Sequence, residues 1–265
     1  MTAYNKLIES QSRTNTRLCV GLDPDVAKLP EGFGTSIEDV VKFTIEVIEA
    51  TEATTPVYKI NFAFFEKFGS KGFEAIETIM ERIPENIFTI ADAKRGDIGN
   101  TSKMYADSVF SHFNFDAITL SPYMGSDSVE PFLEYEDKMI FLLARTSNKG
   151  GDDFQNLISD GKHIYEHVVQ KSSRWASDEQ IGYVAGATRP DELAKIRKLA
   201  PKNVLLIPGV GAQGGDLESV LEANGSGTAI INVSRGVIFP KIIEDYQEDI
   251  FTAGLMFAEI LRIND

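Results

Sequence analysis

Eight short apolar runs recur along this chain, and each is followed by a segment in which apolar residues repeat with helical spacing. The runs are continuous instead of alternating with polar residues, which is typical of parallel strands buried on both faces. They span residues 18–22, 56–61, 87–91, 117–122, 139–145, 181–187, 204–208 and 228–233. Eight strand–helix units in 265 residues predict an α/β protein with a single (β/α)8 (TIM) barrel domain over residues 1–265. A doubly wound open sheet is the main alternative, and the strand count favours the barrel.

The helical periodicity predicts a short helix over residues 1–11, ahead of the first strand, and helices after every strand. The latter span residues 36–54, 64–82, 102–113, 128–135, 161–176, 190–200, 215–223 and 239–263. Ser36, followed by Asp39, is a capping signal at the first of these. The helix over 64–82 is expected to be interrupted around Gly69 and Gly72.

The net charge of −14 argues against nucleic acid or an anionic membrane as the main partner. It does not exclude an anionic ligand, because a local pocket of cations and backbone N–H groups can still bind one. The single cysteine, Cys19, excludes an intramolecular disulfide and, within an apolar run, is expected to be buried and unreactive. Residues 1–16 are polar, and no apolar run is long enough to span a bilayer. We therefore expect a cytoplasmic protein.

The third apolar run leads directly into three ionisable residues, Asp92, Lys94 and Asp97. Because side chains two apart on a strand share a face, we expect Asp92 and Lys94 to point in the same direction. Asp97 would lie in the turn after the strand, where Gly96 and Gly99 permit an irregular path. An acid and a base at the carboxyl end of a buried parallel strand are typical of an active site. A solvated ion pair at a strand end is the alternative.

Other strands of the predicted barrel also deliver charged residues to their carboxyl ends. Asp23 follows the first strand, Lys59 lies in the second, and Arg145 ends the fifth. Two lysines and two aspartates in one cavity are costly to bury unless they pair. We therefore expect Asp23, Lys59, Asp92 and Lys94 to form a paired network.

Residues suited to binding an anion follow the last two predicted strands. Residues 208–215 are a glycine-rich stretch that includes Gln213, and the eighth strand ends in Ser234-Arg235-Gly236. The loops after strands seven and eight of such barrels commonly bind phosphate at a helix N-terminus. Arg235 would supply a bidentate donor, with an exposed surface arginine as the alternative. These features predict a phosphate monoester ligand.

Three further patterns are weaker. Residues 209–214 match G-x-G-x-x-G, but they follow the seventh strand instead of opening a dinucleotide-binding βαβ unit. His163 and His167 have a zinc-binding spacing on a predicted helix, but no third ligand is apparent and a solvated helix face is favoured. Asp152-Asp153 could bind a divalent cation, although a flexible acidic loop is favoured. We therefore expect no metal.

These residues together resemble the orotidine 5′-phosphate decarboxylase family, particularly its bacterial branch with Asp-Ala-Lys-Arg-Gly-Asp-Ile-Gly after the third strand. The resemblance covers essentially the whole chain, although Asp-x-Lys-x-x-Asp alone is shared with related sugar-phosphate decarboxylases. The motifs that carry it are Leu22-Asp23-Pro24, Lys59, residues 92–101, Thr146-Ser147-Asn148, residues 208–216 and Ser234-Arg235-Gly236. One departure is Lys149, where this branch usually has proline, so the resemblance implies the reaction but not the shape of the fifth loop.

The resemblance implies decarboxylation of orotidine 5′-monophosphate to uridine 5′-monophosphate, the last step of de novo UMP synthesis, without a cofactor. Lys94 would stabilise the carbanion and protonate C6, and Asp92 would lie beside the departing carboxylate. Asp23 and Lys59 would hold the ribose hydroxyls, and Lys59 would also brace Asp92. The carbanion cannot be delocalised into the ring, so a fixed ammonium group in a water-poor site is the natural stabiliser.

The resemblance also implies how the rest of the nucleotide is bound. Ser147 would bind the pyrimidine edge, Gln213 and Arg235 would hold the phosphate, and Ser234 would be among the substrate-binding residues. Phosphate binding could drive closure of the Gln213 loop over the charged network.

The resemblance finally implies a homodimer with shared active sites, since Asp97 and Thr101 would reach into the partner's site. Two other functions stay open on the sequence. A magnesium-dependent decarboxylase or aldolase acting on a sugar phosphate is disfavoured by Lys59 and Gln213. A catalytically silent nucleotide-binding protein is disfavoured by the intact charged set of Lys59, Asp92, Lys94 and Asp97.

Overall fold

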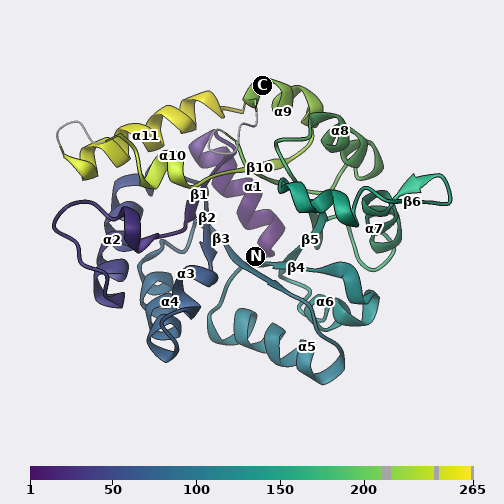
Figure 1. Ribbon diagram of the computed structural model, residues 1–265, viewed down its shortest axis with the longest axis horizontal. Coiled ribbons are helices and arrows are strands. Elements are labelled where there is room, and N and C mark those ends of the chain that lie inside the picture. The colour runs from purple at the N-terminus through teal and green to yellow at the C-terminus, as the bar shows by residue number, and fades with distance from the viewer. Residues whose placement is uncertain (211–215, 242–244, 264–265) are drawn as a thin grey trace.

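Eight parallel strands close into a barrel in the computed structural model, which describes residues 1–210, 216–241 and 245–263 (Figure 1). Their order around the barrel is β1-β10-β9-β8-β5-β4-β3-β2, and β2 pairs with β1 to close it. The strands are β1 (Leu18–Leu22), β2 (Val57–Asn61), β3 (Phe88–Arg95), β4 (Ala117–Leu120), β5 (Met139–Arg145), β8 (Ile181–Ala185), β9 (Leu205–Pro208) and β10 (Ala229–Val233). The fold is the (β/α)8 barrel that the eight apolar runs predict.

The continuous apolar runs are explained by burial on both faces of the barrel wall. Phe88, Ile90 and Leu206 point into the barrel interior and pack there against one another. Residues on the other face of the strands, such as Ile140 and Leu205, pack against the surrounding helices. Since successive strand residues point to opposite faces, both sets of positions must be apolar.

Helices cover the outside of the barrel (Figure 1). The longer ones are α1 (Ala3–Thr14), α2 (Ile37–Thr51), α4 (Ser70–Arg82), α5 (Gly99–Ala106), α7 (Ile164–Ser172), α8 (Pro190–Leu199), α9 (Leu217–Asn224) and α11 (Tyr246–Ile260). Short helices are α3 (Ala63–Glu66), α6 (Glu130–Leu133), α10 (Arg235–Ile238), and the 3-10 turns η1 (Val26–Lys28), η3 (Pro122–Met124), η4 (Ser126–Ser128) and η5 (Lys149–Asp153). Ser36 and Asp39 form the expected capping box at α2. Gly69, at φ 65°, separates α3 from α4, so the predicted interruption is present.

A small hairpin occupies part of the helix predicted over residues 161–176, and the prediction was wrong there. Strands β6 (Ile158–Ser159) and β7 (Lys162–His163) pair antiparallel before α7 begins. Asp160 and Gly161 form its two-residue turn, and both have positive φ, at 49° and 75°. Asp-Gly between two short strands is a strong hairpin signal, because a type I′ turn needs positive φ at both positions. The helical periodicity of the following residues hid it.

Three other predicted helices differ in their extent. The helix predicted over 128–135 is only the short α6, preceded by the 3-10 turn η4. The helix predicted over 102–113 begins earlier, at Gly99, and changes into a π-helical turn, η2 (Asp107–His112). The final helix, predicted over 239–263, begins only at Tyr246. Asp245 caps it, since its carboxylate accepts a hydrogen bond from the backbone N–H of Gln247 at 2.9 Å.

Helix α1 closes the amino end of the barrel, across which it lies in Figure 1. Leu7 is fully buried and packs with the apolar residues of the barrel interior. Lys6 pairs with Asp116, just before β4, at 2.7 Å, and the Gln11 amide donates to the carbonyl of Ala229 at 2.8 Å. Helix α1 therefore covers the end of the barrel opposite the carboxyl ends of the strands.

Cys19 lies in the barrel interior and is fully buried, as predicted, and burial raises the pKa of its thiol far above the usual range. The helices in the described part of the chain include none with both the length and the apolar character needed to cross a membrane.

Candidate active site

A cavity of about 510 Å³ lies at the carboxyl ends of the barrel strands. Leu143, Val184 and Leu206 form an apolar part of its wall, and polar side chains from several strand ends complete it. Seven of the predicted site residues line it: Asp23, Lys59, Asp92, Lys94, Ser147, Ser234 and Arg235. An apolar cavity with a few convergent charged groups is the usual form of a small-molecule site.

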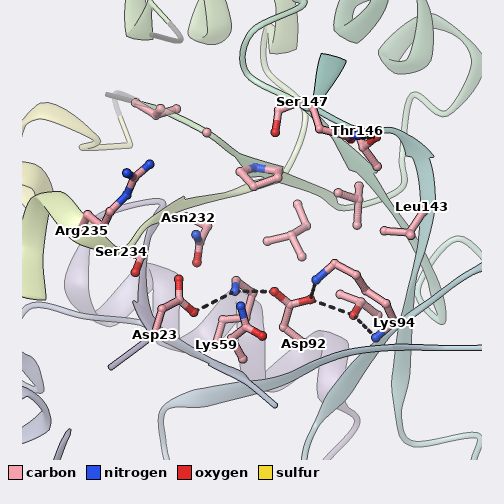
Figure 2. Close-up of a pocket in the computed structure, with 18 of the residues that line it drawn as sticks. Asp23, Lys59, Asp92, Lys94, Leu143, Thr146, Ser147, Asn232, Ser234 and Arg235 are labelled. Atoms are coloured by element: carbon pink, nitrogen blue, oxygen red, sulfur yellow. Dashed lines mark hydrogen bonds and ion pairs between the residues drawn. The ribbon is translucent and has the colours of Figure 1, made fainter. Parts of the chain in front are cut away.

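Two lysines and two aspartates alternate along one side of the cavity (Figure 2). The Lys59 ammonium lies 2.7 Å from Asp92 Oδ2 and 4.0 Å from Asp23 Oδ1. The Lys94 ammonium lies 2.5 Å from Asp92 Oδ1, so Asp92 lies between two cations. The structure therefore brings together the four residues that the sequence places at three different strand ends.

The pKa values of the buried members follow from this pairing. Burial by itself would lower the pKa of Lys59, but the charges of Asp92 and Asp23 outweigh burial and hold that pKa above its ordinary value. Burial would likewise raise the pKa of Asp92, whereas Lys59 and Lys94 hold it well below the usual range. Asp92 and Lys59 therefore both carry charge at neutral pH.

Lys94 does not have the regular strand geometry that the sequence predicts. Its φ is 47°, in the left-handed region, and the pairing of β3 with β4 shifts register between Ala91 and Arg95. Thr119 of β4 supports this irregular backbone: its hydroxyl accepts a hydrogen bond from Lys94 N and donates one to Asp92 Oδ1, each at 3.0 Å. The expectation that Asp92 and Lys94 converge was correct, but regular alternation is the wrong reason. A positive φ in a residue other than glycine is strained and needs such support.

The expected phosphate end lies across the cavity from Lys94, where Figure 2 shows Ser234 and Arg235. Both line the cavity where β10 leads into α10. Gln213 lies outside the described residues. Ser234 Oγ and Asp23 Oδ1 are buried and find no hydrogen-bond partner among the residues that are described. Since buried polar atoms are usually hydrogen-bonded, these two oxygens mark positions suited to polar groups of a ligand.

Asp97 and Thr101 are not among the residues that line this cavity. Asp97 is partly buried in the turn after β3, where its carboxylate accepts a hydrogen bond from Ile98 N at 2.8 Å. Thr101 is exposed on α5. The chain therefore does not use these two side chains in its own cavity.

Four polar residues that no sequence motif indicates also line the cavity: Asn61, Thr119, Gln155 and Asn232. Three of them lie within or at the end of apolar runs that become strands β2, β4 and β10. A lone polar residue in a doubly buried strand is a usable signal for a site. Gln155 follows η5 and carries no such signal.

The weaker metal candidates have other partners. His163 Nδ1 lies 2.8 Å from the carbonyl of Asn156, and His167 Nε2 lies 2.8 Å from that of Ser159. The His167 contact joins the β6–β7 hairpin to α7, whereas the His163 contact joins β7 to the residues just before β6. The expectation of a merely solvated helix face was therefore incomplete. Asp152 pairs with two arginines instead of lying in a free acidic loop. Within the described residues no three His, Cys, Asp or Glu side chains are grouped closely enough to hold a metal ion.

Comparisons with known proteins agree on one family. The family model described as "Orotidine 5'-phosphate decarboxylase / HUMPS family" matches residues 16–241. The orotidine 5′-phosphate decarboxylase of Herpetosiphon aurantiacus is 48% identical over 259 residues, which cover 97% of this chain and 92% of that protein. The enzyme of the same name from Dehalococcoides mccartyi strain BAV1 is 46% identical over 248 residues, covering 91% of this chain and 90% of that protein.

Solved structures give the same result. The Leishmania donovani OMP decarboxylase matches with a TM-score of 0.87 and 37% identity, covering 98% of both chains. The Leishmania donovani UMP synthase matches with a TM-score of 0.89 and 39% identity, covering 98% of this chain and 56% of that one.

Proposed function

We propose orotidine 5′-monophosphate as the substrate of this chain, which belongs to the orotidine 5′-phosphate decarboxylase / HUMPS family. The chain is a carboxy-lyase of pyrimidine biosynthesis that converts this substrate into uridine 5′-monophosphate and CO2. The observation that carries the proposal is the alternating network of Asp23, Lys59, Asp92 and Lys94 in the cavity. Such a network provides a fixed ammonium group where negative charge develops.

The reaction breaks the bond between C6 and the carboxylate carbon, and the electron pair stays at C6 while CO2 leaves. We assign to Lys94 the stabilisation of that charge and the transfer of its proton to C6. The contact of Lys94 with Asp92 supports this, because Asp92 fixes the ammonium at the cavity wall. Asp92 would lie beside the departing carboxylate, and Lys59 would hold Asp92 in place.

The remaining cavity residues suit the other parts of the nucleotide. Asp23 and Lys59 would bind the ribose hydroxyls, which is supported by Asp23 Oδ1: it is buried, 4.0 Å from the Lys59 ammonium, and accepts no hydrogen bond from the described residues. Arg235 and Ser234, with Gln213, would bind the phosphate at the far end from Lys94. Ser147 would bind the pyrimidine edge.

We also propose a homodimer in which Asp97 and Thr101 complete the partner's site. Three exposed apolar side chains lie near these two residues along the chain: Ile98, Met104 and Tyr105, just before and on α5. Tyr123 and Met124 are also exposed, on η3, which follows β4, the strand beside β3. Tyr123 is 88% exposed. Large exposed apolar side chains on the segments that follow β3 and β4 support a protein–protein interface there.

The test is to follow the ultraviolet absorbance of orotidine 5′-monophosphate after adding the purified protein with a metal chelator present. We expect conversion to uridine 5′-monophosphate at an unchanged rate with and without chelator. No absorbance change would contradict the proposal, and loss of activity with chelator would point to a metal-dependent reaction.

A further inference from the structure

Arg145 is a buried cation that the proposed reaction does not use. It ends β5, its side chain is 1% exposed, and residues 146–148 directly after it line the cavity. Its guanidinium pairs with Asp152 and lies 3.3 Å from Glu192 of α8. A buried guanidinium is costly unless its partners are well placed, so its position needs an explanation.

Gln155 links this guanidinium to the cavity wall. Gln155 Oε1 lies 3.3 Å from Arg145 Nη1 and accepts a hydrogen bond from Thr146 N at 2.9 Å. Gln155 Nε2 donates to Thr146 Oγ1 at 2.9 Å. Since Gln155 and Thr146 both line the cavity, Gln155 connects the Arg145 guanidinium to the cavity wall.

The loop after β5, residues 146–155, is also fixed from outside. Arg189 lies 2.9 Å from Asp152 and 4.0 Å from Glu192, so two arginines and two carboxylates join the loop to α8. Two glycines allow this close approach. A Cβ at Gly151 would lie 2.5 Å from Arg145 Nη1.

The second glycine, Gly186, follows β8. A Cβ there would lie 2.7 Å from the backbone N of Ser147. Figure 2 shows Thr146 and Ser147 on the side of the cavity opposite Asp92 and Lys59. The loop after β5 therefore forms the wall that faces the charged network.

We propose that Arg145 is a positioning residue: it holds the loop after β5 so that Thr146, Ser147 and Gln155 meet the substrate's base at the correct distance from Lys94. This inference rests on the proposed function, because it takes the bound base to lie against this wall. Arg145 itself does not touch the substrate.

Replacing Arg145 by methionine keeps most of the side-chain volume and removes the guanidinium. We expect kcat/KM of Arg145→Met for orotidine 5′-monophosphate to fall between about tenfold and a hundredfold, mainly through a higher KM, because Lys94 and Asp92 are unchanged. Free guanidinium at a low, non-denaturing concentration should restore part of the loss, and equal sodium chloride should not.

Arg197→Met is the matched control. Arg197 is also a buried arginine, bonded to the carbonyl of Asn203 at 2.8 Å and to Asn224 at 2.8 Å, but it does not line the cavity. We expect this variant to lose thermal stability, to keep kcat/KM within about twofold, and to show no response to guanidinium. A folded Arg145→Met protein with kcat/KM near that of the wild type would overturn the proposal.

Should Arg145→Met fail to fold, Asp152→Asn decides the question, because Asp152 is 40% exposed and its replacement leaves the guanidinium in place. A raised KM supports the positioning role, and an unchanged KM contradicts it. An inactive wild-type protein would instead contradict the proposed function. In that case the affinity of each variant for uridine 5′-monophosphate, measured by calorimetry, tests Arg145 on its own.

Discussion

At the scale of single residues, Lys94 carries the chemistry that we propose. Lys94→Ala removes both the ammonium that would stabilise charge at C6 and the proton that C6 receives. We expect kcat to fall by about 10³-fold or more. Circular dichroism should show an unchanged fold, since Lys94 is half exposed and contributes little packing. Near-normal turnover by a folded Lys94→Ala protein would remove Lys94 from this role.

Thr119 of β4 is expected to support the same proton transfer by holding Lys94 and Asp92 in position. Thr119→Val leaves Lys94 N and Asp92 Oδ1 without the hydroxyl that both contact. We expect kcat to fall by about tenfold while KM changes less, because the displaced groups act on the reacting carbon.

Thr89→Val is the control, since Thr89 is equally buried and its hydroxyl bonds to Asp116 at the closed end of the barrel. Each variant should lose about 1–3 kcal/mol of stability. Only Thr119→Val should lose turnover, and an equal loss in both would count against a role for Thr119 in the site.

The Lys59–Asp92 pair predicts how stability depends on pH. The pKa of Asp92 is lowered from 3.8. Its contribution to the unfolding free energy is therefore fully present above pH 3.8 and is lost as the pH falls toward the lowered pKa. The pKa of Lys59 is raised from 10.5. Its contribution to the unfolding free energy is therefore fully present below pH 10.5 and is lost only as the pH rises from there through the raised pKa. Between about pH 5 and pH 9 this pair should add no pH dependence.

Urea unfolding of wild type and Asp92→Asn from neutral pH down to about pH 2 checks the prediction for Asp92. Below about pH 4 the unfolding free energy of the wild type should fall more steeply with decreasing pH than that of the variant. If the unfolding free energies of the two proteins fell equally steeply below about pH 4, Asp92 would not have a lowered pKa in the folded protein.

At the scale of elements, α1 and the loop after β5 act at opposite ends of the barrel. Leu7→Ala would leave a cavity where α1 closes the amino end, and we expect a loss of about 2–5 kcal/mol in unfolding free energy. The kcat/KM of the folded variant should be unchanged, because the active-site cavity is at the other end. Ile8→Ala on the same helix is the control. Because Ile8 is 37% exposed, its replacement should lower the unfolding free energy far less. Similar urea midpoints for the two variants would contradict a closing role for Leu7.

At the scale of the whole molecule, the proposed dimer predicts recovery of activity between two inactive chains. A hybrid of Lys94→Ala and Asp97→Ala chains has one site with both lesions and one intact site. With random subunit exchange about half of the dimers are hybrids, so the mixture should regain about a quarter of wild-type activity.

Mixing Lys94→Ala with Asp92→Ala chains is the matched control, because each site then keeps one lesion and no activity should return. Failure of the first mixture to recover, despite subunit exchange seen by native mass spectrometry, would contradict shared active sites.

Much of the fold could be predicted because the information is local. A continuous apolar run such as residues 139–145 is typical of a doubly buried strand, and Ser36 with Asp39 marks a helix start within one turn. The hairpin around Asp160-Gly161 is just as local, but the helix predicted from residue 161 onward included its second strand, so the hairpin was not predicted.

The site could be predicted only in part. The amino acid order alone determined which charged residues lie at strand ends, and in a closed parallel barrel those ends meet at one cavity. Only the tertiary structure decided that Thr119 supports the left-handed backbone at Lys94, and that Arg145 is joined through Gln155 to the cavity wall. These contacts depend on the register between neighbouring strands and on loops packed against a distant helix. Spacing along the chain records which side chains share a strand, but not which side chain on the next strand lies within hydrogen-bond distance.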